Sequence, residues 1–166
     1  PKLLAANRLR TPMLAYHDHN AAKVRPDLIR RLKDGQVVAL VSDAGTPLVS
    51  DPGYRLVEAV VAEGLPVTAI PGPSAVLAAL VLSGLPSDRF FFAGFLPPRG
   101  AARRTGIRSL AAVPGTLIFY EAPSRLAETL ADLHAVLGAR PAAVARELTK
   151  RFEEVRRGTL DRLSAQ

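Results

Sequence analysis

Several residue types that build common functional sites are missing from this chain or scarce in it. It has no cysteine and no tryptophan, only three histidines and one methionine, and aromatic residues make up 5% of it. Without cysteine the chain forms no disulfide and offers no thiolate as metal ligand or nucleophile. His17 and His19 lie close together with no third ligand beside them. We therefore expect no metal site.

Long apolar runs and targeting signals are also missing. The longest apolar run, residues 75–82, stops at Ser83-Gly84, far short of the roughly 18 residues that a membrane-spanning helix needs. No basic segment followed by an apolar stretch opens the chain. Neither a G-x-G-x-x-G nor a P-loop fingerprint occurs. We expect a cytoplasmic protein that uses no membrane, flavin or nicotinamide.

What the chain does contain suits a folded core and a negatively charged partner. Its 166 residues are enough for one domain or two small ones, and 48% of them are hydrophobic. The net charge is +7, and most of the excess lies in residues 87–166, with thirteen basic and eight acidic residues. Residues 99–108 carry four arginines and no acid: Arg99, Arg103, Arg104 and Arg108. Such a cluster favours a polyanionic partner over an ordinary solvent-exposed face.

The pattern of elements predicts an α/β protein. Strands are expected at 12–16, 37–41, 66–70, 89–92, 116–120, 142–146 and 153–157. Helices are expected at 20–33, between Gly53 and Glu63, at 75–82, 101–112 and 123–137, and from 159 onward. Strand–helix alternation in the first part predicts a parallel sheet, whereas the second part indicates a mixed one. We place the two domains at residues 1–87 and 88–166.

Two loops rich in glycine and proline follow the expected strands of the first domain. They are Ser42–Gly53 and Pro71–Ala75. Open parallel sheets bind ligands at the carboxyl ends of their strands, and small side chains let a ligand approach the backbone. From spacing alone, plain turn chemistry explains these loops equally well.

Five segments in order resemble the tetrapyrrole methylase superfamily, the class III S-adenosylmethionine (SAM) methyltransferases. They read VSDAGTPLVSDPGYRLV, IPGPSA, LPSDRFFFAGFLP, FYEAPSRL and ARELTKRFEEVRRGTL. The SDAGTP form is typical of the branch that methylates 16S ribosomal RNA, whereas the porphyrin-precursor branch usually has Gly-Asp-Pro there. The family's opening strand, its loop after that strand and its last strands have no counterpart here, so we expect a two-domain fold truncated at both ends.

The resemblance implies a SAM-dependent 2′-O-ribose methyltransferase for a cytidine in the decoding region of 16S rRNA, within the small ribosomal subunit. It also implies a homodimer, because family members are commonly dimers. Carried over by position, the cofactor-binding residues are Asp43, Ala44, Gly45, Thr46, Val49, Ser74, Ala75, Tyr120 and Ala145.

The chemistry of the transfer suggests further candidates. A ribose hydroxyl is a weak acid, so a nearby group is expected to accept its proton. Glu121, Glu147 and Asp51 are candidate acceptors, and Lys150 could lower the pKa of the hydroxyl or act as a base. The alternative that no single side-chain base is essential stays open.

The arginine cluster is assigned to RNA. If residues 101–112 form a helix, Arg104 and Arg108 lie one turn apart and Arg103 adjoins them, so three guanidiniums could follow one strand of RNA phosphates. Two other functions remain open. One is methylation of a tetrapyrrole (porphyrin or corrin) precursor, and the other is a non-catalytic RNA-binding fragment.

Overall fold

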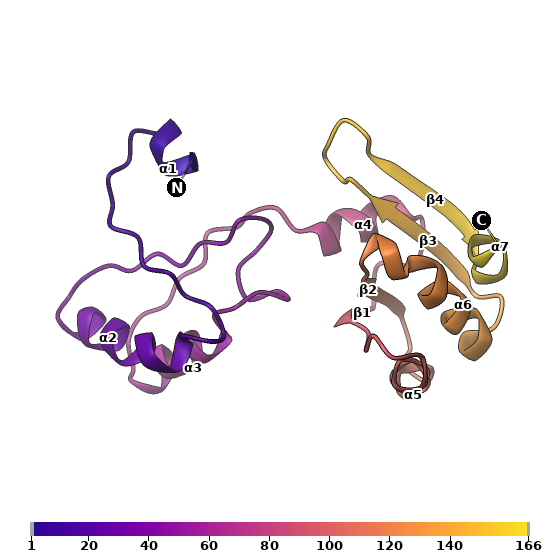
Figure 1. Ribbon diagram of the computed structural model, residues 1–166, viewed down its shortest axis with the longest axis horizontal. Helices are drawn as coiled ribbons and strands as arrows, with labels where there is room; N and C mark the ends of the chain where they lie inside the picture. Colours follow the sequence, from indigo (N-terminus) through magenta and orange to yellow (C-terminus); the bar gives the residue numbers. More distant parts are fainter. Residues whose placement is uncertain (1, 166) are drawn as a thin grey trace. The chain divides into compact units, whose positions relative to one another are not determined.

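The computed structural model describes residues 2–165 and shows two compact units, which divide between residues 72 and 73 (Figure 1). The expected domain boundary after residue 87 falls inside the second unit. The reason is that helix α4 (Ala75–Ser83) packs against strands β3 (Pro141–Arg146) and β4 (Glu154–Thr159). The division at residue 87 stays a prediction.

The first unit is built around two helices. They are α2 (Ala21–Lys33) and α3 (Tyr54–Ala62), preceded by the short α1 (Lys2–Ala6). Leu28 of α2 packs with Leu56 and Val60 of α3, which recur at helical spacing. Lys33 and Glu63 close the helix ends with an ion pair of 2.7 Å. Both helices confirm the sequence prediction.

The parallel sheet expected in the first domain does not form, and this prediction is wrong. Residues 12–16, 37–41 and 66–70 belong to no strand, and none of residues 2–72 pairs in a ladder. Val37 is 96% exposed and Ile70 is 91% exposed. The residues have strand-like composition, but a strand exists only where a neighbour accepts and donates its backbone hydrogen bonds.

The second unit begins with a capped helix. The Ser74 hydroxyl accepts a hydrogen bond from the Leu77 backbone N–H at 3.4 Å, and α4 ends at Gly84 in the left-handed conformation. Both ends follow the sequence signals for a helix start and stop.

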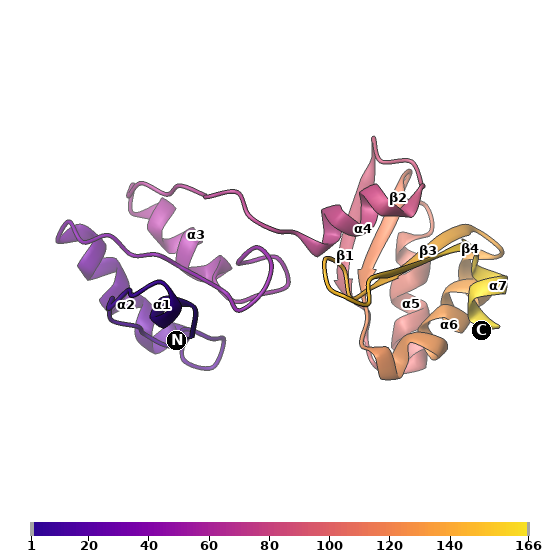
Figure 2. The same ribbon diagram turned by 90° about the horizontal axis from the view of Figure 1, so that it is seen from above.

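A parallel strand pair with a crossover helix follows α4. Strand β1 (Phe90–Phe95) pairs with β2 (Thr116–Tyr120), starting from the Phe90–Thr116 register. The connecting helix is α5 (Gly100–Leu110), which Figure 2 shows beside the two strands. This unit has the βαβ order that the sequence predicts, with a crossover that parallel strands require.

The rest of the unit is a helix, a hairpin and a short closing helix. The 3₁₀ turn η1 (Pro123–Arg125) leads into α6 (Leu126–Leu137), then β3 and β4 pair antiparallel, and α7 (Leu160–Ser164) follows. The expected mixture of strand directions is confirmed. The two pairs form separate two-stranded sheets, so a single mixed sheet is not present within residues 73–165.

The core of the second unit joins the helices that cover these strands. Six leucine and isoleucine side chains are buried together: Leu96, Ile107, Leu130, Leu133, Leu160 and Leu163. Ile107 of α5 is fully buried, so α5 and α6 are fixed against each other. Among the described residues, no helix combines the length and the apolar character needed to cross a membrane.

Candidate cofactor and substrate site

The loop Ser42–Gly53 in the first unit has an unusual backbone. Gly45, Leu48 and Ser50 all have positive φ, at 72°, 73° and 56°. Such values are uncommon for residues with a side chain and persist where the surrounding structure imposes them. The Ser42 hydroxyl donates to the Ala44 carbonyl at 3.0 Å. The loop therefore has a defined shape rather than the plain turns that spacing alone allowed.

All five cofactor candidates on this loop lie at the surface. Asp43, Ala44, Gly45, Thr46 and Val49 are exposed. A Cβ built on Gly45 would meet no heavy atom within 4 Å, so one face of its backbone is open. Gly53 differs, because its Cβ would lie 2.6 Å from Leu40 and 2.8 Å from Leu48. Gly53 thus lets the base of the loop pack, whereas Gly45 leaves its backbone accessible to a ligand.

The second unit brings together three further cofactor candidates. Ser74 caps α4 and Ala75 is its first residue. The hydroxyl of Tyr120, at the end of β2, hydrogen-bonds to the backbone of Val76, the second residue of α4. The Tyr120 ring packs edge-on against Phe92, with ring centres 4.8 Å apart. Burial raises the pKa of Tyr120, and the bond to Val76 opposes that rise. The ring is neutral and fixed at the start of the helix.

Ala145, the ninth cofactor candidate, lies in β3 opposite Val155 of β4. The nine candidates are therefore divided, with five in the first unit and four in the second. Their role in binding one common ligand stays a prediction.

Glu121 is the most fully engaged of the proton-acceptor candidates. Its carboxylate accepts hydrogen bonds from the Thr129 hydroxyl at 2.6 Å and the Ala122 N–H at 2.7 Å, and it pairs with Arg125 at 2.5 Å. Burial acts to raise the pKa of Glu121, but these partners outweigh it and hold the pKa below its usual value. The carboxylate secures η1 and the start of α6, and a lowered pKa makes it a weak base.

Two further acid–base candidates share one loop. Glu147 and Lys150 lie between β3 and β4 and form an ion pair of 3.2 Å. Both side chains are largely exposed, and Glu147 has a φ of 49°. Their exposure leaves both groups open to a substrate, in contrast to Glu121.

The predicted row of three accessible guanidiniums on α5 is wrong for Arg103. That side chain is 3% exposed and donates to Asp132 of α6 at 2.6 Å, to Glu128 at 3.3 Å and to the Pro98 carbonyl at 3.3 Å. A buried guanidinium with three acceptors is a packing element between α5 and α6. The sequence suggested a basic face because the acids that neutralise Arg103 are not near it in sequence. They come 25 and 29 residues later.

The remaining arginines of the cluster differ in their freedom. Arg104 donates to Asp132 at 3.0 Å and is 44% exposed in its side chain, whereas Arg99 and Arg108 are exposed. Burial acts to raise the pKa of Asp132, and the two arginines lower it below its usual value. The role of Arg99 and Arg108 as RNA contacts stays a prediction, and the Arg104 side chain is exposed only in part.

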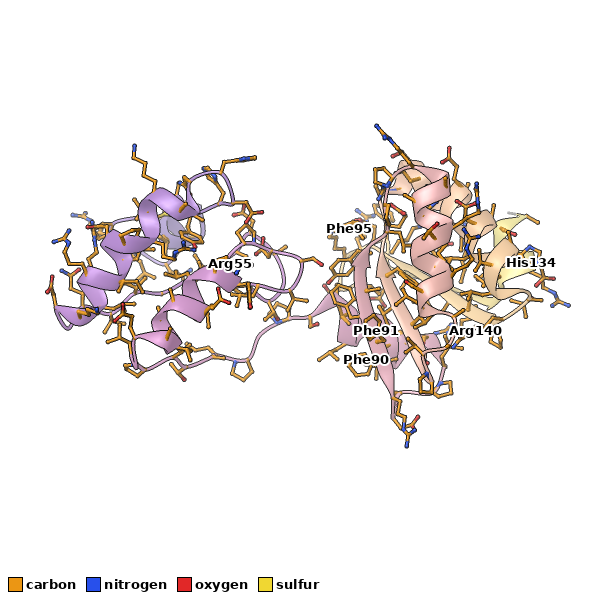
Figure 3. All side chains as sticks on the ribbon, turned by 90° about the horizontal axis from the view of Figure 1, so that it is seen from below. Arg55, Phe90, Phe91, Phe95, His134 and Arg140 are labelled. Atoms are coloured by element: carbon orange, nitrogen blue, oxygen red, sulfur yellow. The ribbon has the colours of Figure 1, made fainter. Side chains whose placement is uncertain are left out.

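A hollow of about 290 Å³ lies in the first unit and was not predicted from the sequence. Tyr16, Arg25, Asp51 and Arg55 are among its lining residues. Arg55 projects from α3, as Figure 3 shows, and its guanidinium lies 5.4 Å from the centre of the Tyr54 ring. Arg25 lies on α2 and Arg55 on α3, and nothing in the sequence indicates that these two side chains line the same hollow. Asp51, considered above as a proton acceptor, lies on its wall.

The histidines form no metal centre within residues 2–165. His17 and His19 meet edge-on with ring centres 6.0 Å apart, and no group of three potential ligands gathers in the described part of the chain. Nothing in this geometry assigns them a ligand.

Comparison with known proteins connects these loops to a family. Residues 3–164 match the family described as Tetrapyrrole (Corrin/Porphyrin) Methylases.

The chain is similar to proteins named Ribosomal RNA small subunit methyltransferase I. It is 58% identical to that of Mesorhizobium japonicum over 98% of this chain and 55% of the relative. For Xylella fastidiosa the identity is 55%, over 99% of this chain and 61% of the relative. For Halalkalibacterium halodurans it is 46%, over 96% and 55%. The chain spans about half the length of the curated relatives it matches.

Proposed function

The chain belongs to the tetrapyrrole methylase family, an α/β methyltransferase family, and we propose that it forms part of a SAM-dependent methyltransferase acting on small-subunit ribosomal RNA. The observation that carries this proposal is the 58% identity, across nearly the whole chain, to a relative named for that activity. The shaped loop Ser42–Gly53, which holds the SDAGTP sequence, supports it.

The residues present suit SAM. SAM carries a sulfonium charge and, when bound, supplies the methyl group for transfer. The candidate positions offer open backbone at Gly45, a small residue at Ala75 and the neutral Tyr120. A strongly anionic lining would stabilise the charged cofactor more than the transition state, in which that charge disappears. Asp43 is the one acid among the nine candidates, and the others would bind and orient the cofactor without adding negative charge.

We further propose that the acceptor is the 2′-oxygen of a cytidine in the decoding region of 16S rRNA. Holding that oxygen in line for transfer supplies much of the rate enhancement. For the proton we favour the exposed pair Glu147 and Lys150 over Glu121, because the hydrogen bonds and lowered pKa of Glu121 commit it to the fold. A ribosomal substrate places the reaction in the cytoplasm. We also propose that the protein acts as a homodimer.

The test is transfer of labelled methyl groups from SAM to 30S subunits by the protein. A 2′-O-methyl group blocks alkaline cleavage of the adjoining phosphodiester, so we expect the label in an alkali-resistant dinucleotide that contains cytidine. Label in alkali-sensitive mononucleotides would refute the ribose position. Label transferred to a tetrapyrrole precursor and not to 30S subunits would favour the alternative activity.

A variant tests the cofactor loop separately. Gly45→Val places a branched side chain on the open backbone face, at a φ that β-branched residues avoid. We expect calorimetry to show SAM affinity reduced at least about tenfold. Gly35→Val is the matched control, because Gly35 has a similar φ of 81° and open surroundings but lies outside the loop, and its SAM affinity should change little. Unchanged SAM affinity in Gly45→Val would refute the loop assignment.

A further inference from the structure

The loop that joins β3 to β4 is a shaped turn at the end of a hairpin. Glu147 and Thr149 both have positive φ, at 49° and 65°. The Thr149 N–H donates to the Glu153 carboxylate at 2.7 Å, and the Lys150 N–H donates to the Glu147 carbonyl at 3.0 Å. Figure 1 shows this turn extending beyond the helices of the second unit. We call residues 147–153 the hairpin tip.

The hairpin tip exposes a phenylalanine beneath an arginine. Phe152 is 71% exposed, the largest exposure of any phenylalanine among the described residues. The guanidinium carbon of Arg151 lies 5.5 Å from the centre of its ring. Leaving a benzyl group in water forgoes about 1.5–3 kcal/mol of burial energy, and a ligand that covers the ring would recover part of it.

The charges around this ring favour a polyanion. Residues 146–157 contain five basic and three acidic side chains. Glu154 pairs with both Arg146 and Arg156, and Glu147 pairs with Lys150. Arg151 forms no ion pair with any residue in the described range 2–165, so its charge is available to a ligand.

We propose that the hairpin tip binds single-stranded RNA, with one unpaired base stacked on Phe152 and its phosphate contacted by Arg151. Unpaired bases are recognised by stacking on aromatic rings and guanidinium planes. The inference rests on the proposed RNA substrate and goes beyond it by naming a base-binding surface. A base held here brings its ribose toward Glu147 and Lys150, which occupy the same tip.

The alternatives predict different outcomes. A second copy of the chain covering Phe152 would bury the ring against protein, but the unpaired charge of Arg151 would then face an equally basic copy. A purely electrostatic surface would need the arginines and not the ring. The experiment therefore has to separate stacking from charge and from self-association.

The chain has no tryptophan, which allows a direct measurement of stacking. Phe152→Trp places a single indole at the tip. We expect its fluorescence to be quenched by a single-stranded oligocytidine of about 12 nucleotides, within the usual length of such sites. An abasic oligonucleotide of the same length supplies phosphates without bases and should leave the fluorescence unchanged. Equal quenching by both, or quenching by neither, would overturn the inference.

Affinity measurements give an independent readout. We expect Phe152→Ala to weaken binding of the oligocytidine by about 5- to 150-fold, which corresponds to the 1–3 kcal/mol of one stacked base. Phe152→Leu, which keeps apolar bulk but loses the ring, should resemble Phe152→Ala, while Phe152→Tyr should bind like the parent. Phe91→Ala is the matched control, since Phe91, labelled in Figure 3, is 43% exposed on β1 and, among the described residues, no arginine lies over its ring.

Two outcomes separate this inference from the proposed function. If the parent methylates 30S subunits and Phe152→Ala binds the oligonucleotide as tightly as the parent, the inference is wrong and the proposed function stands. If Phe152→Ala instead lowers the mass of an assembly in sedimentation and leaves RNA affinity unchanged, the ring belongs to an interface between copies and the inference is again overturned.

Discussion

Removing Asp132 should destabilise the second unit far more than removing any surface acid. Asp132 lies on α6 and accepts hydrogen bonds from Arg103 at 2.6 Å and Arg104 at 3.0 Å. In Asp132→Ala the buried Arg103 guanidinium keeps only the Pro98 carbonyl and the distant end of Glu128, which is itself 72% exposed. A buried charge then loses its closest counter-ion.

The expected size follows from the burial of this pair. Removing one partner of a buried ion pair costs about 3–5 kcal/mol, because the remaining charge stays desolvated without compensation. Arg104→Ala removes a bond to the same carboxylate from a side chain that is 44% exposed. An exposed partner of that kind contributes up to about 1 kcal/mol. The two variants should therefore differ by several kcal/mol.

Native-state hydrogen exchange is the assay, because it reports each unit separately. Peptides from α5 and α6 should exchange about 100-fold to several thousandfold faster in Asp132→Ala, and less than about tenfold faster in Arg104→Ala. The double variant Arg103→Met, Asp132→Leu replaces the pair by apolar side chains and should recover most of the protection. A change below about 1 kcal/mol in Asp132→Ala would refute the reasoning.

Two further predictions follow from carboxylates and glycines. The pKa values of Asp132 and Glu121 are lowered in the folded state, so their contribution to stability is present above the usual carboxyl values of 3.8 and 4.5 and is lost as the pH falls through the lower folded values. An acid titration of α6 exchange rates should show this loss, and Glu121→Gln should flatten the curve. Gly53→Ala should destabilise the first unit by about 1–3 kcal/mol, because its Cβ overlaps two leucine side chains, whereas Gly45→Ala should cost about 1 kcal/mol or less. Limited proteolysis of the loop compares the two, and equal rates would contradict the difference.

The helices were predictable because their signals are local. Ser74 and Gly84 mark the ends of α4 as expected, and the leucines of α6 lie at helical spacing. The four strands of the second unit were also predicted, since each pairs with another segment of the same unit.

The expected strands of the first unit show the limit of such signals. Residues 37–41 have the composition of a buried strand, but composition describes a preference and not a partner. Parallel pairing joins segments that are distant in sequence, and nothing in the pattern itself names the neighbour. The cofactor loop Ser42–Gly53 was located correctly as a loop because glycine and proline punctuate it. The positive φ values of Leu48 and Ser50 could not be read from the sequence.

The position of the accessible positive charge was the least predictable feature. Four arginines without an acid nearby favoured α5, yet Glu128 and Asp132 reach Arg103 from a helix later in the chain. These two acids lie one helical turn apart on α6, which is the spacing that lets both approach one guanidinium. The acids of the hairpin tip are Glu147, which pairs with Lys150, and Glu153, which accepts a hydrogen bond from the Thr149 N–H, so neither neutralises Arg151. Counting charges along the sequence therefore favours α5 as the accessible positive surface. The ion pairs instead favour the hairpin tip. RNA affinities of Arg151→Ala and of the double variant Arg99→Ala, Arg108→Ala test this order. If the double variant weakens RNA binding more, the ion pairs predict the RNA surface less well than the charge count does, and α5 is the main RNA surface.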